Sequence, residues 1–151
     1  MLTFSSITQV LDFAMQSEQE AVDFYSRLAQ QSTNESMKQV FTSFAKEEME
    51  HKLKLLKVRE VGLSHWKAEF VADLKIADYT PDVPSLTSLS YEQALVVAMK
   101  KEKAAFRLYS DLAEGVSNPE LKDMFTLLAM EESKHKLRFE LEYDQEVLRE
   151  N

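Results

Sequence analysis

The sequence predicts an all-α protein, a four-helix bundle built from two copies of one helical hairpin. Three observations lead to this prediction. The 151 residues include only 2 glycines and 3 prolines, whereas a β-sandwich of this length would need many more turn residues. Apolar residues recur every three or four positions along four long segments, which is the spacing of one helix face. The second half of the chain also repeats the first. We expect one domain over residues 1–151.

A shift of 84 residues places the two halves of the sequence on each other without a gap. Residues 6–53 then align with residues 90–137, and 21 of the 48 aligned positions are identical. Unrelated sequences would match at roughly one position in seventeen, so the repeat indicates a duplication. The first hairpin is predicted over residues 6–61 and the second over residues 90–149.

The first helix of each copy begins with the same signal. Ser6 and Ser90 are each followed by glutamine three residues later, a capping-box pattern that satisfies backbone N–H groups at a helix start. These two helices are expected to end near Ala29 and Ala113.

The second helix of each copy follows a short turn, predicted over residues 30–34 and 114–118. The second turn ends in Asn118-Pro119, an N-cap residue followed by proline at the first helical position. The helix of the first copy is expected to end near Val61, and that of the second copy close to the C-terminus.

Residues 62–89 join the hairpins, and these 28 residues are enough to cross the length of a bundle. A short helix packed on the bundle is predicted within this crossover. Its apolar residues would be Trp66, Phe70, Val71 and Leu74.

Each predicted helix has one apolar face, and charged residues interrupt that face at its middle. In chain order the four faces consist of Leu11, Ala14, Glu18, Ala21, Tyr25 and Leu28; of Met37, Phe41, Phe44, Glu48, His51, Leu55 and Val58; of Leu95, Ala98, Glu102, Ala105, Tyr109 and Leu112; and of Leu121, Phe125, Leu128, Glu132, His135 and Phe139. The core of the bundle is therefore predicted to contain four carboxylates and two imidazoles.

These charged residues are candidate metal ligands. Glu18 precedes Glu48 by 30 residues, as Glu102 precedes Glu132, so an antiparallel hairpin can bring each pair to one level. Burying an unpaired charge costs several kcal/mol, and two divalent cations would balance the four carboxylates. One glutamate from each of two helices and Glu-x-x-His from the other two is the ligand set of di-iron and di-manganese bundles. The full set is Glu18, Glu48, His51, Glu102, Glu132 and His135. The alternatives are a satisfied polar network and a vestigial site.

Two tyrosines lie near these candidates. Tyr25 and Tyr109 each follow the first glutamate of their copy by seven residues, two helical turns along the same face. Each phenol is expected either to hydrogen-bond a ligand carboxylate or to be an ordinary core tyrosine.

Composition excludes several function classes. A formal net charge of −8 argues against nucleic-acid binding and against a general affinity for anionic membranes. The chain has no cysteine, which excludes disulfides, thiolate metal sites and cysteine nucleophiles. No run of about 18 apolar residues and no leader pattern is present, so a cytoplasmic protein is expected.

The two motif sets resemble the rubrerythrin branch of the ferritin-like superfamily. The first copy reads Glu18-x-x-Ala21 with Phe24-Tyr25, then Glu47-Glu48-x-x-His51. The second reads Glu102-x-x-Ala105 with Tyr109, then Glu131-Glu132-x-x-His135. The resemblance implies a ferritin-like bundle, two iron ions held by the six candidate ligands, reaction with peroxide or dioxygen, and often a homodimer. Manganese and zinc also suit such ligands.

The sequence departs from that pattern in two ways. Rubrerythrins proper carry a four-cysteine rubredoxin domain that delivers electrons, and this chain would need an external electron-donor protein instead. They also carry an extra ligand glutamate where this chain has Ala105. From the predicted pair of metal ions we expect an oxidoreductase, either a peroxidase or a ferroxidase. The alternatives are a non-catalytic protein that binds or handles iron, and a purely structural bundle.

Overall fold

The computed structural model of the chain describes residues 4, 6–61, 74–83 and 89–150. These residues form four α-helices and one 3-10 helix. The α-helices are α1 (Ile7–Gln31), α2 (Glu35–Val61), α3 (Tyr91–Gly115) and α4 (Pro119–Glu150), and the 3-10 helix is η3 (Ile76–Tyr79). The predicted helix boundaries are confirmed to within about two residues, which is the usual uncertainty at helix ends.

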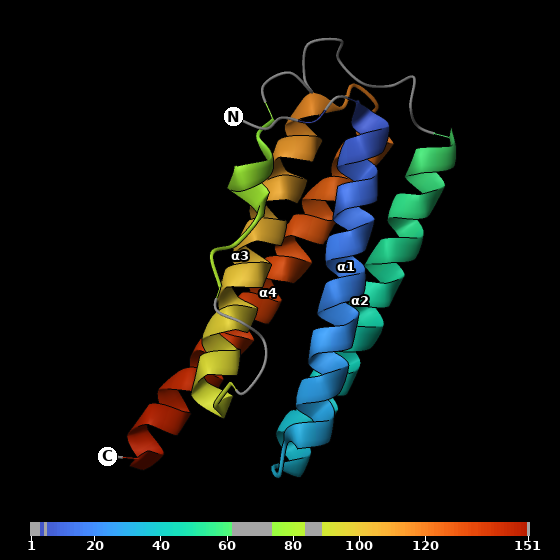
Figure 1. Cartoon of the computed structure of the whole chain (residues 1–151). Coiled ribbons are helices and arrows are strands. Elements are labelled where there is room, and N and C mark those ends of the chain that lie inside the picture. Colours follow the sequence, from blue (N-terminus) through green and yellow to red (C-terminus); the bar gives the residue numbers. More distant parts are fainter. Residues whose placement is uncertain (1–3, 5, 62–73, 84–88, 151) are drawn as a thin grey trace. The chain divides into compact units, whose positions relative to one another are not determined.

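The chain divides into two compact units, which correspond to the two copies of the repeat. One unit contains the hairpin of α1 and α2, and the other contains η3 and the hairpin of α3 and α4. Figure 1 shows the two helices of each hairpin side by side. The turns explain this arrangement, because a chain that reverses over three residues places its second helix against its first.

Polar side chains cap the helix starts as the sequence predicts. The hydroxyl oxygen of Ser6 accepts a 3.1 Å hydrogen bond from the backbone N–H of Gln9. Ser90 accepts the equivalent bond from Gln93, and the Gln93 side chain accepts a 2.9 Å bond from the backbone N–H of Ser90, which completes a capping box. Asn118 accepts bonds from two N–H groups in the first turn of α4.

The predicted apolar faces form the core of each hairpin. All their members are buried except Phe44, Ala105 and Leu121, which are half-buried. Tyr25, Phe41 and Leu55 are fully buried in the first hairpin, and Tyr109 and Phe125 are buried at the corresponding depth of the second. Each hairpin therefore positions its charged residues between layers of large apolar side chains.

The crossover contributes a short segment that packs on α3. Of the residues predicted to form its helix, Leu74 is buried but not helical, and Trp66, Phe70 and Val71 lie outside the described residues. Within residues 74–83, the described middle of the crossover, the helix is η3, which contacts α3 through the buried Tyr79.

Candidate metal centre

The first hairpin brings together Glu18 of α1 with Glu48 and His51 of α2, and we call these three residues the N-terminal triad. The imidazole Nδ1 of His51 lies 3.4 Å from a carboxylate oxygen of Glu48 and 3.7 Å from one of Glu18. All three side chains are almost completely buried, with at most 2% exposed. Because Glu48 and His51 are separated by one helical turn, they share the face of α2 that meets α1.

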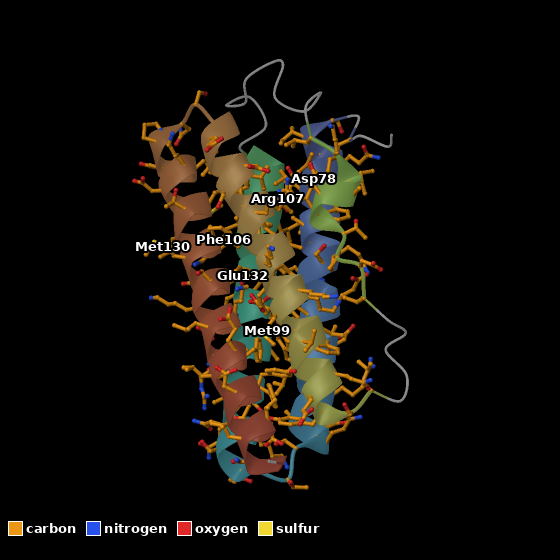
Figure 2. The ribbon with its side chains drawn as sticks, turned by 90° about the vertical axis from the view of Figure 1, so that its left-hand side faces the viewer. Asp78, Met99, Phe106, Arg107, Met130 and Glu132 are labelled. Atoms are coloured by element: carbon orange, nitrogen blue, oxygen red, sulfur yellow. The ribbon has the colours of Figure 1, made fainter. Side chains whose placement is uncertain are left out.

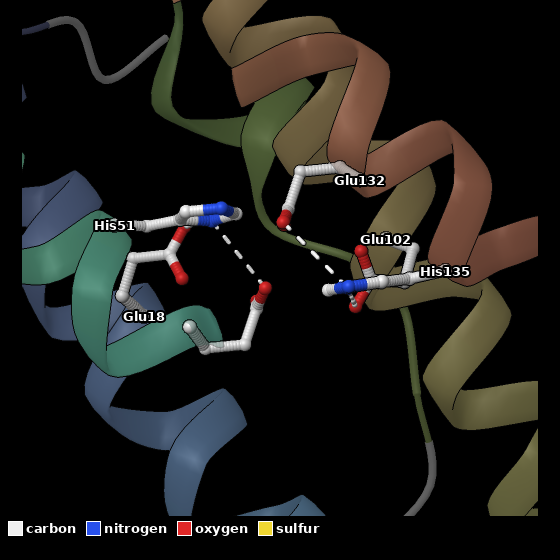
Figure 3. A network of polar contacts seen from close by, with 6 residues as sticks. Glu18, His51, Glu102, Glu132 and His135 are labelled. Atoms are coloured by element: carbon white, nitrogen blue, oxygen red, sulfur yellow. Dashed lines mark ion pairs between the residues drawn. The ribbon is translucent and has the colours of Figure 1, made fainter. Parts of the chain in front are cut away.

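The second hairpin repeats this arrangement with Glu102 of α3 and with Glu132 and His135 of α4, the C-terminal triad. Nδ1 of His135 lies 3.6 Å from Glu102 and 3.9 Å from Glu132. At most 3% of each residue is exposed. Figure 3 shows the side chains of this triad together with Glu18 and His51. The spacing of 30 residues between the paired glutamates thus predicted both triads.

The donor atoms of each triad fit a single metal ion. One possible donor atom from each member lies within 4.8 Å of those of the other two. In a metal shell with bonds of about 2.0–2.2 Å, neighbouring donor atoms lie about 3–3.5 Å apart, close to the separations seen here. The imidazole–carboxylate distances are also longer than the ~2.9 Å of an ordinary hydrogen bond. Two carboxylates and a neutral imidazole balance the charge of one divalent cation, so each triad suits such an ion.

Tyr25 and Tyr109 are buried in the cores of their hairpins, with at most 1% exposed. The ring centroids of Tyr25 and Phe44 are 6.5 Å apart, and the two rings make an edge-on contact. The ring centroids of Tyr109 and Phe125 are also 6.5 Å apart, and these rings are stacked. These contacts hold the two rings in place. A hydrogen bond from either phenol to a ligand carboxylate remains a prediction.

One buried acidic residue was not identified from the sequence. Glu142 of α4 is only 2% exposed, and its carboxylate accepts a 3.3 Å hydrogen bond from the hydroxyl of Tyr91. It lies seven residues after His135 on the same helix face, and Val58 stands at the equivalent position of the first hairpin. An extension of the α4 face by one more turn would have found it.

A second buried polar contact was also missed. The Tyr79 hydroxyl of η3 donates a 2.6 Å hydrogen bond to Oδ2 of Asp111 on α3. Burial, and then this hydrogen bond to an anion, raise the pKa of Tyr79 well above its ordinary value. Because Tyr79 belongs to the crossover, no helical spacing could have indicated this pair.

The fold and the triads define the class of protein. A crystal structure of a candidate ferritin-like diiron-carboxylate protein from Thermotoga maritima matches 97% of this chain and 99% of its own, with a TM-score of 0.77 and 21% sequence identity. This likeness covers both hairpins, and the chain therefore has the all-α, ferritin-like four-helix bundle fold.

The family follows from the sequence itself. The family model named Rubrerythrin matches residues 9–143, and the chain belongs to the rubrerythrin family. Among curated proteins, none matches this chain. No helix in the described part of the chain is long and apolar enough to cross a membrane.

Proposed function

We propose that the chain is a di-iron oxidoreductase that reacts with peroxide or dioxygen, as a rubrerythrin-like peroxidase or as a ferroxidase. The observation that carries the proposal is the presence of two equivalent, buried Glu–Glu–His triads in one chain of the rubrerythrin family. The six ligands would be Glu18, Glu48, His51, Glu102, Glu132 and His135, three from each hairpin.

The family resemblance, together with a donor set that suits iron, supports iron as the native metal. Carboxylates and imidazole bind iron, manganese and zinc, and the family resemblance favours iron among them. Bound iron would supply electrons and Lewis acidity for the reduction of peroxide or dioxygen. The glutamates would neutralise the cations and could alternate between one-oxygen and two-oxygen binding. The buried rings of Tyr25 and Tyr109 would limit water around the ligands, and their hydroxyls would orient ligand carboxylates.

Turnover would need electrons from outside the chain. The sequence contains no cysteine, so it cannot bind iron through the four thiolates that the rubredoxin domain provides in rubrerythrins proper. The proposal therefore includes an external electron-donor protein, and both proteins would act in the cytoplasm.

A non-catalytic role in binding or handling iron is the alternative. The observation that favours it is Ala105, which stands three residues after Glu102 where rubrerythrins proper carry a further ligand glutamate. Without this carboxylate the two triads have the same composition. Such a symmetric site suits reversible iron binding as well as peroxide reduction.

The test is iron oxidation by the purified chain. The protein is loaded with Fe²⁺ under anaerobic conditions to about two ions per chain, mixed with hydrogen peroxide or with dioxygen, and followed by the near-ultraviolet absorption of ferric iron. We expect the wild type to oxidise iron at least ~100-fold faster than the Glu48→Ala, Glu132→Ala variant, because those substitutions remove one carboxylate from each triad.

The chain offers a matched control for this experiment. Glu47 and Glu131 directly precede the two ligands, are half-buried and lie off the apolar faces. The Glu47→Ala, Glu131→Ala variant should oxidise iron at the wild-type rate. Equal rates of iron oxidation for the wild type and the Glu48→Ala, Glu132→Ala variant would overturn the proposal of an oxidoreductase. Stoichiometric iron binding with no faster oxidation would favour iron handling instead.

A further inference from the structure

A row of exposed apolar side chains runs along α4 on the side opposite to the C-terminal triad. The row consists of Leu127, Met130, Leu137, Leu141 and Leu148, which are between 46% and 73% exposed. Figure 2 shows Met130 on the outer side of α4. Leu137 follows the buried His135 by two residues, a turn of about 200° around the helix. We call this row the outer row, and it faces away from the core of its hairpin.

The duplication provides an internal reference for the outer row. The residues of α2 that correspond to Leu127, Met130 and Leu141 are Ser43, Lys46 and Lys57. Of the members that have a described counterpart, Leu137 alone corresponds to an apolar residue, which is Leu53. The outer face of α2 thus has the composition of a solvated surface, whereas that of α4 does not. Exposed apolar side chains gathered along one helix face in this way mark an interaction site.

The spacing of the outer row is that of a coiled-coil seam. With Lys134 and Asp144 included, its members lie at alternating intervals of three and four residues from Leu127 to Leu148. This stretch is about 32 Å long. Lys134 and Asp144 are the two charged members of the seam, and both are exposed.

These two charges select the partner and its direction. The family resemblance implies a homodimer, and we propose that the outer row is its interface: α4 packs antiparallel against α4 of a second copy, with the two-fold axis at the level of Phe139. Lys134 and Asp144 lie five residues on either side of this level, so each Lys134 meets Asp144 of the other copy. Leu137 and Leu141 meet in the same way, as do Met130 and Leu148. The surface is therefore complementary to itself, as a two-fold interface requires.

Other arrangements of the same helices bring unfavourable pairs together. In a parallel pair, Lys134 would face Lys134 of the other copy, and Asp144 would face Asp144 of the other copy. Like charges in a seam repel. An antiparallel pair shifted by one heptad would place Lys134 opposite Leu137, or Asp144 opposite Leu141, which buries each charge without an opposite charge. The register about Phe139 avoids both costs.

Sedimentation equilibrium of the full chain tests the interface. We expect a dimer of twice the 17.5 kDa chain mass. Leu137→Glu should raise the dimer dissociation constant at least about 100-fold, because both copies lose a buried leucine and gain a buried charge. Leu53→Glu is the matched control, since Leu53 is the repeat equivalent of Leu137 and is similarly exposed. It should leave the dissociation constant unchanged. A wild-type monomer at all concentrations, or equal effects of the two substitutions, would overturn the proposal.

Charge reversal tests the direction and register. Lys134→Asp alone and Asp144→Lys alone should each weaken the dimer about 10-fold or more, whereas the double variant should restore it. In a parallel dimer the double variant would restore nothing, because like charges would still face each other.

Cysteine cross-linking gives an independent answer, because the chain has no cysteine of its own. An equimolar mixture of Met130→Cys and Leu148→Cys chains should form a disulfide-linked dimer on mild oxidation. Met130→Cys alone should not, because its two thiols would lie about 27 Å apart along the seam. Rapid cross-linking of the single variant would exclude the antiparallel register.

Discussion

His51 and Glu18 are 33 residues apart in the chain, yet Nδ1 of His51 lies 3.7 Å from a carboxylate oxygen of Glu18 inside the first hairpin. A carboxylate oxygen of Glu48 lies 3.4 Å from the same Nδ1 atom, so two buried carboxylates lie close to each other around one imidazole. Without a cation, these negative charges oppose the packing of the helices that carry them. With a cation, the same charges bind the hairpin together. Metal binding and folding are therefore expected to be linked.

The first prediction is a reversal of stability order with metal. Glu48→Gln, Glu132→Gln should raise the melting temperature by about 2–5 °C in excess chelator, because it removes one negative charge from each triad. In saturating Mn²⁺ the wild type should gain more than the variant and become the more stable protein. Differential scanning calorimetry measures both states. The Glu47→Gln, Glu131→Gln variant is the control. If the same protein, wild type or ligand variant, had the higher melting temperature both in chelator and in Mn²⁺, the linkage between metal binding and folding would be contradicted.

The second prediction concerns the number of ions. Each triad contains two carboxylates and one imidazole, so each hairpin is expected to hold one ion. His51→Ala and His135→Ala should each lower the bound Mn²⁺ from about two to about one per chain, as measured by elemental analysis after dialysis. The two variants serve as controls for each other, because they disrupt equivalent triads. A count that stays near two in either variant would show that its histidine is not a ligand.

The third prediction concerns the contact between η3 and α3. Tyr79→Phe should lower the free energy of unfolding by about 1 kcal/mol at pH 7, because it removes the hydrogen bond to Asp111. The raised pKa of Tyr79 gives this difference a pH dependence. Above its ordinary pKa of about 10, the unfolded chain releases the phenol proton while the folded chain keeps it. Stability from this residue is therefore lost as the pH rises above about 10.

Urea unfolding at pH 8 and at pH 11 measures this effect. The stability difference between wild type and Tyr79→Phe should shrink or change sign at the higher pH. Asp111→Asn keeps an acceptor but removes the negative charge, so it should show a smaller alkaline loss than wild type. A difference that stays constant with pH would mean that the phenol does not ionise later in the folded chain.

The sequence was sufficient to predict the helices and the membership of the triads, since both depend on local spacing. Glu48 and His51 share a face because they are one turn apart, and Glu18 reaches them because the turn of the hairpin is short. Duplication strengthened this inference, because chance would not place Glu102, Glu132 and His135 at the same three positions.

Contacts that depend on packing between distant segments could not be predicted in this way. Tyr79 reaches Asp111 from a crossover without helical periodicity. Glu142 is buried where the apolar face of α4 continues further than expected, beside Tyr91 at the start of α3. Spacing predicts which residues share a helix face but not how completely neighbouring segments cover each of them, and Phe44 and Ala105 are less buried than the other members of their faces.

The fourth prediction uses Ala105 to test the limits of peroxide chemistry. Ala105 lies three residues after Glu102 on α3, so a side chain at this position extends along the same face as the C-terminal triad. Ala105→Glu would supply the carboxylate found there in rubrerythrins proper. We expect iron oxidation by hydrogen peroxide to become at least ~10-fold faster, because a further anionic ligand stabilises the oxidised metal.

Stopped-flow absorbance of the Fe²⁺-loaded variant measures this rate, with dioxygen as a second oxidant. Ala21→Glu is the mirror variant, because Ala21 is the repeat equivalent of Ala105 in the first hairpin. Since the two triads have the same composition, it should give a similar gain. If the asymmetry of rubrerythrins proper is what favours peroxide, a glutamate at Ala21 together with one at Ala105 should lose part of the gain, since it makes the two triads equivalent again. Equal peroxide rates for wild type and Ala105→Glu would mean that Ala105 does not limit the reaction, and that the choice of oxidant depends on residues outside the triads.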